Sequence, residues 1–82
     1  MIEVQIVDTG SAPVELAIDR YALMVGDLAT AATVALHVAI DLAADLREST
    51  GRPVMVRVES GRVGYQVCSE RGAVYYHVRA VI

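Results

Sequence analysis

Three runs of alternating residues near the C-terminus constrain the fold more than any other feature of this chain. In each run, β-branched or aromatic side chains occupy every second position, a pattern typical of strands with one buried face. The runs span residues 54–59, 63–68 and 74–80. Ser60-Gly61 and Arg71-Gly72 separate them, and glycine suits a two-residue hairpin turn because it tolerates a positive φ. The pattern predicts a three-stranded antiparallel meander.

Two-residue turns would also fix how the three strands pair. Val58 would lie opposite Val63 in the first hairpin, and Val67 would lie opposite Tyr76 in the second. Apolar side chains would then meet apolar side chains across both pairs of strands. We therefore expect one face of the meander to be buried.

A long helix is expected in the middle of the chain. Asp27 is a good N-cap residue, and Gly51 and Pro53 mark the other end. Read at every fourth position, three of the four ridges between these ends are apolar, which is unusual for a surface helix. The fourth ridge carries His37 and Asp41, and such polar groups argue against a membrane span. We expect a helix buried on most of its sides.

The N-terminal quarter shows weaker alternation. Apolar residues alternate over 2–6 and again over 14–18, with a polar turn sequence between them. This pattern favours a second β-hairpin, followed by a short helical segment from residue 20 that ends at Gly26. The alternative is a helix over residues 12–25 that begins at a Ser11 cap.

Together these elements predict an α+β fold. The element order is ββαβββ, with one antiparallel-rich sheet and a long apolar helix packed on one face. A chain of 82 residues is expected to form a single domain over residues 1–82.

The chain is more apolar than its size requires. Hydrophobic residues make up 55% of the sequence, yet a domain this small has little interior. Small residues at every fourth position would let a second helix approach closely, so one ridge is a candidate dimer interface. That ridge consists of Ala31, Ala35, Ala39 and Ala43. We expect a symmetric homodimer; the alternative is that the alanines let the helix lie close to its own sheet.

Composition also suggests a cellular setting. Cys68 is the single cysteine, so no disulfide can form within the chain. The N-terminal residues lack the basic start of a signal peptide, which favours a cytoplasmic protein. All seven basic residues are arginine, a bias typical of GC-rich genomes such as those of actinobacteria and their phages.

Catalytic motifs are not evident in the sequence. Two pairs of side chains could support acid–base or thiol chemistry: His37 with Asp41 one helical turn later, and Cys68 with His77 on neighbouring strands. A helix-surface hydrogen bond and a packed thiol are the more ordinary interpretations. No metal or cofactor is expected.

A weak anion-binding site is expected on the meander. The predicted pairing places Arg57 and Arg79 beside Gly64, with Gln66 and His77 next to them. Two guanidinium groups suit a carboxylate or phosphate. The alternative is that an acidic side chain of the chain itself pairs with these arginines. The candidates for that pairing are Glu3, Glu15 and Glu59.

Three classes of function follow from these features. The first is a non-enzymatic interaction or accessory protein that acts as a homodimer, alone or with another protein. The second is an anion, small-ligand or nucleic-acid binding module that uses the Arg57/Arg79 face, although a net charge of −3 makes nucleic acid an unlikely partner. The third is a small enzyme using one of the two histidine pairs. The sequence names no partner or ligand.

Overall fold

The computed structural model describes residues 1–14, 16 and 22–81. It has the predicted ββαβββ order, and the α+β fold is confirmed. The elements are β1 (Ile2–Asp8), β2 (Ala22–Val25), α1 (Leu28–Thr50), β3 (Val54–Val58), β4 (Gly64–Ser69) and β5 (Val74–Val81).

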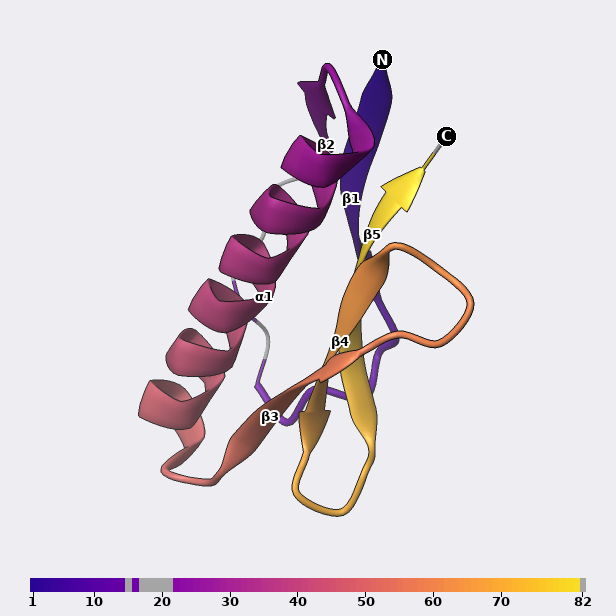
Figure 1. Cartoon of the computed structure of the whole chain (residues 1–82). Helices are drawn as coiled ribbons and strands as arrows, with labels where there is room; N and C mark the ends of the chain where they lie inside the picture. The colour runs from indigo at the N-terminus through magenta and orange to yellow at the C-terminus, as the bar shows by residue number, and fades with distance from the viewer. Residues whose placement is uncertain (15, 17–21, 82) are drawn as a thin grey trace.

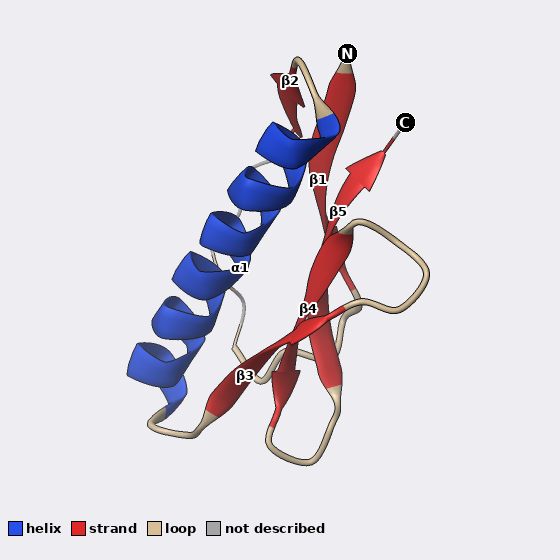
Figure 2. Cartoon of the chain, in the orientation of Figure 1, coloured by secondary structure: helices blue, strands red, loops and turns tan. Residues whose placement is uncertain are grey.

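The five strands form one antiparallel sheet. Its strand order is β2-β1-β5-β4-β3, so the C-terminal strand β5 lies at the centre. Helix α1 runs diagonally across one face of the sheet (Figure 1). No described helix or strand packs on the opposite face, although the connection between β3 and β4 projects on that side (Figure 2). We call this opposite face the open face.

The ends of α1 are those that the sequence predicts. The Asp27 carboxylate accepts a hydrogen bond from the backbone N–H of Thr30 at 2.8 Å. At the other end Gly51 adopts a left-handed conformation with φ of 67°, and its N–H donates to the Arg47 carbonyl. Both caps satisfy backbone groups that a helix terminus would otherwise leave unpaired.

The alanine ridge of α1 packs against the helix's own sheet. All four alanines are fully buried, and Leu42 and Leu46 extend the contact. The buried sheet residues opposite them are Val4, Val54, Val67, Tyr76 and Val78. The prediction that this ridge forms a dimer interface is therefore wrong for Ala31, Ala35, Ala39 and Ala43. Small residues bring the helix backbone close to the sheet, and the side chains of the sheet fill the space between them.

A different ridge of α1 is apolar, and no described segment fully covers it. Leu28 and Ile40 on this ridge are exposed, and Leu36 between them is half-buried. By length and composition α1 could also cross a membrane, with a mean hydropathy of 1.4 in its most apolar window. The apolar residues of α1 that contact the sheet form part of the hydrophobic core.

The meander pairs partly as predicted. Val67 lies opposite Tyr76 between β4 and β5, as expected. Val58, however, lies opposite Tyr65 and not Val63. The reason is the connection between β3 and β4, which runs from residue 59 to 63 and is closed by a hydrogen bond from the Glu59 N–H to the Gly64 carbonyl. This longer loop displaces the first pairing by two residues and so preserves which face each side chain occupies.

The turn between β4 and β5 also exceeds two residues. The Gly72 N–H donates to the Ser69 carbonyl, and Gly72 has φ of 91°. The pairing then shifts between Val67 and Cys68, so that Cys68 lies opposite Val74. A turn of this kind with a glycine at positive φ commonly accompanies such an irregularity.

The N-terminal hairpin has a different second strand from the one predicted. Strand β1 pairs with Ala22–Val25, so a helix over residues 20–25 or 12–25 is wrong for the residues of β2. Val14 and Leu16 lie outside any described strand and pack against the core. The alternation of apolar residues here therefore reflects side chains that hold a loop against the core and does not indicate a strand. The rest of that prediction, at residues 15 and 17–21, lies outside the described residues.

Candidate interaction surface on the open face

A carboxylate clasped by two basic side chains forms the centre of the open face. Glu59 follows β3, and Arg79 and His77 come from the central strand β5. The Arg79 guanidinium donates to both carboxylate oxygens, with distances of 2.8 to 3.2 Å. Nδ1 of His77 lies 2.8 Å from Oε1 of Glu59. We call these three residues the charged cluster.

Gly64 provides the space in which this cluster forms. It lies opposite Arg79 on the neighbouring strand. A Cβ at Gly64 would come within 2.6 Å of the Val78 carbonyl oxygen and 3.2 Å of the Glu59 carboxylate. Any larger residue would therefore displace the backbone or the carboxylate.

The charged cluster is largely shielded from water, although no described helix or strand packs over it. The Glu59 residue is only 7% exposed. The hydrogen bonds from Arg79 lower the pKa of Glu59, against the opposing effect of burial. The same bonds raise the pKa of Arg79. Both groups therefore stay charged near neutral pH, and their charges cancel.

His77 is held by the same carboxylate. Its Nδ1 atom is buried and has no hydrogen-bond partner among the described residues apart from the close contact with Glu59. The contact fixes one nitrogen of the imidazole ring towards the cluster. A carboxylate placed in this way orients an imidazole.

The predicted anion-site residues are only partly brought together. Arg79, Gly64, Gln66 and His77 lie on adjacent positions of β4 and β5. Arg57 lies opposite Gln66 and not beside Gly64, and its guanidinium donates to the Gln66 side-chain oxygen at 2.8 Å. The Glu59 carboxylate holds Arg79, which is the alternative that the sequence had left open. Binding of an external anion there stays a prediction.

The candidate catalytic pairs are placed less favourably. The Cys68 thiol is buried and lies 3.7 Å from the Met55 carbonyl. His37 and Asp41 are exposed on α1, and within the described residues no hydrogen bond or ion pair joins them. Neither arrangement presents an activated nucleophile or a base beside a pocket.

Exposed apolar side chains surround the charged cluster on the open face. They come from four strands, and their register places them on the same face as Glu3, Gln5 and His77. These residues are Val7, Met24, Met55 and Val81. We call them the apolar ring.

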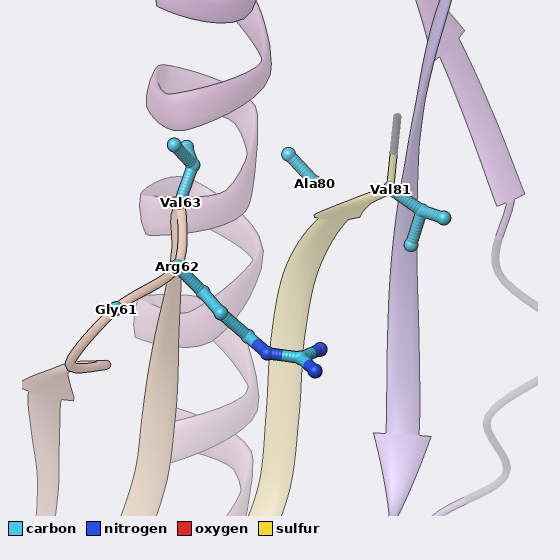
Figure 3. Close-up of a pocket in the computed structure, with 5 residues that line it drawn as sticks. All are labelled: Gly61, Arg62, Val63, Ala80 and Val81. Carbon is cyan, nitrogen blue, oxygen red and sulfur yellow. The ribbon is translucent and has the colours of Figure 1, made fainter.

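A cavity of about 570 Å³ adjoins the ring where β4 begins and β5 ends. Val63, Ala80 and Val81 line it, and the side chain of Arg62 crosses β5 (Figure 3). The cavity does not reach the charged cluster. It makes this end of the open face concave and places one positive charge there.

Comparison with known proteins finds no matching family model, no similar curated protein and no similar solved structure. Functional inference therefore starts from the open face itself. Sequence patterning identified Arg79, Gly64 and His77 as neighbours, but it treated Glu59 as one of three acidic candidates. The sequence feature that singles out Glu59 is its position directly after a strand, with a glycine and an arginine on the two following strands.

Proposed function

We propose that this chain is a non-enzymatic interaction protein that acts as a homodimer, with the open face of its sheet as the dimer interface. The observation that carries this proposal is the combination of a water-shielded Glu59–Arg79 pair, whose charges cancel, with the apolar ring around it. Interface cores are typically depleted of charged residues; here the central charges neutralise each other, and the apolar side chains lie around them. Glu59 and Arg79 already satisfy each other, so covering them adds no unpaired charge.

The strand order makes this face suitable for a two-fold contact. Because β5 is central, a two-fold axis along it would place β1 of each copy over β4 of the other. Glu3 lies in the same row of the sheet as Val81 on the β1 side, and on the β4 side that row leads to Arg62. Glu3 of one copy would then lie over the Arg62 end of the other, which favours this pairing over random association.

The size of the face is adequate. The molecule is a slab of 36 × 25 × 18 Å, and the sheet forms one of its broad sides. A standard protein interface buries roughly 800 Å² on each partner. A broad side of this outline is of that order.

The partly covered ridge of α1 is the competing surface for a second copy. It is apolar but consists of isolated large residues such as Leu28 and Ile40 beside alanine, threonine and acidic neighbours. Its charged neighbours Asp41 and Asp45 are both acidic, and the ridge carries no basic residue that would complement them in a second copy. The open face provides both apolar area and charge, so we favour it.

A matched pair of variants tests the proposal by light scattering after size exclusion. The chain mass is 8.8 kDa, and we expect wild type to elute at twice that value. Met55→Glu on the apolar ring is expected to give a folded monomer. Ile40→Glu on the helix is expected to remain a dimer, although Met55 and Ile40 are similarly exposed at 51% and 46%.

Three results would overturn the proposal. One is a wild-type monomer at every concentration examined. Another is dissociation by Ile40→Glu but not by Met55→Glu, which would assign the interface to the helix. The last is an unchanged dimer with both Met55→Glu and a second ring variant, Val81→Glu, while circular dichroism shows that each variant is folded.

A further inference from the structure

We infer that a second cavity, at the opposite end of the sheet from Arg62, binds a nucleoside phosphate. The cavity has a volume of about 540 Å³, within the range of small-molecule sites. It lies between the connection from α1 to β3 and the turn from β4 to β5. Arg52 comes from the connection, and Arg71 and Tyr75 come from the hairpin.

Two guanidinium groups at this cavity are available to a ligand. Within the described residues neither Arg52 nor Arg71 takes part in an ion pair, because both ion pairs involve Glu59. Each guanidinium presents donors in a planar fork that matches phosphate oxygens. A terminal guanidinium nitrogen of Arg57 also approaches the turn, 3.7 Å from where a Cβ of Gly72 would lie. The local charge is positive even with Glu70 at the rim.

The turn holds Arg71 in a defined position. The Ser69 hydroxyl oxygen accepts hydrogen bonds from the backbone N–H groups of Arg71 and Ala73 at 3.3 and 3.1 Å. The Gly72 N–H donates to the Ser69 carbonyl. A fixed backbone reduces the ordering cost of binding. The hydroxyl hydrogen of Ser69 stays available to donate to a phosphate.

Tyr75 extends the ligand class from a simple anion to a nucleoside phosphate. Its ring lines the same cavity as the two arginines and is partly exposed. An aromatic side chain beside cationic groups is the pairing that binds a base by stacking and a phosphate by charge. Glu70 at the rim offers an acceptor for a sugar hydroxyl. This inference does not depend on dimer formation.

Isothermal titration calorimetry with ADP as the probe tests the site. We expect ADP to bind wild type, with adenosine and pyrophosphate each binding more weakly because each keeps only one half of the recognition. Arg71→Ala and Arg52→Ala are each expected to weaken ADP binding about tenfold or more. Tyr75→Leu is expected to weaken it about fivefold or more, whereas Tyr75→Phe keeps the ring and retains binding.

Arg62→Ala is the control, because Arg62 is an exposed arginine next to a turn glycine at the other end of the sheet. Absence of any ADP binding at millimolar concentration would overturn the inference. So would ADP binding that Arg71→Ala and Arg52→Ala leave unchanged. Pyrophosphate that binds as tightly as ADP, together with no effect of Tyr75→Leu, would reduce the site to a plain anion site and overturn the nucleoside assignment.

Discussion

The two faces of this sheet exclude water by different means. On the face under α1, Val4, Val67 and Val78 are fully buried, and alanines on the helix allow close packing. On the open face, Glu59 reaches a similar burial although no described helix or strand covers it. It does so because Arg79 and His77 surround its oxygens. Apolar burial by a second layer stabilises the first face, whereas pairing within the sheet stabilises the second.

This difference indicates what each face can do. An apolar face sealed by a helix contributes to stability but is not available to a partner. A polar cluster formed by β5 and the connection that follows β3 is ordered before any partner arrives, so binding at the open face would incur little further ordering cost.

The largest effect is expected under the helix. Leu46→Ala removes a fully buried side chain and should lower the free energy of unfolding by about 2–5 kcal/mol, because it leaves a cavity. Leu36→Ala makes the same chemical change on the partly covered ridge and should cost less. Urea denaturation of both variants checks this. Equal losses would show that the two ridges are covered alike, contrary to the structure.

A smaller effect is expected on the open face. Glu59→Gln keeps the shape of the side chain but removes the charge that Arg79 and His77 contact. It should lower the free energy of unfolding by about 1.5–3 kcal/mol, the range for hydrogen bonds to charged groups. Glu48→Gln, on an exposed carboxylate of α1, is the control and should change stability by no more than about 0.5 kcal/mol. A loss no larger than the control would contradict a structural role for the cluster.

Local signals predicted the parts of the fold that local interactions decide. The Asp27 and Gly51 caps set the helix ends, and alternation with a glycine turn set the pairing of Val67 with Tyr76. Strand β2 was not predicted, because four consecutive apolar residues between Ala22 and Val25 carry no period that separates strand from helix. Pairing with β1 makes this segment a strand.

The remaining differences arise from contacts between distant segments. Glycine at residue 61 is compatible with a two-residue turn and with the longer loop that the structure has. Because the loop length sets how β3 pairs with β4, this glycine alone does not determine which residue lies opposite Arg57. The inward ridge of α1 was misassigned because side-chain volume favoured leucine and valine, whereas close approach to the sheet selects alanine. Glu59 alternates as a solvent-facing residue, and only Gly64 and Arg79 on later strands make it buried.

The smallest effect, and the one that best isolates the charged cluster, is a pH dependence. The folded state lowers the pKa of Glu59 from its ordinary value of 4.5, chiefly through the Arg79 hydrogen bonds. Below that value the unfolded chain takes up a proton that the folded chain does not, so falling pH favours unfolding. The stability that Glu59 contributes is therefore complete above pH 4.5 and is lost as the pH falls through the lower folded-state pKa.

Comparing wild type with Glu59→Gln cancels the titration of the groups that do not contact Glu59. Urea denaturation of the two proteins at a series of pH values should give a constant stability difference above the ordinary carboxyl pKa and a shrinking difference below it. Met55→Glu should leave this profile intact, because the cluster forms within one chain. A difference that stays constant throughout the acid range, while both proteins remain folded, would mean that Arg79 does not hold a charged Glu59. Packing, and not the ion pair, would then stabilise the arrangement of side chains on the open face, as it does on the face under α1.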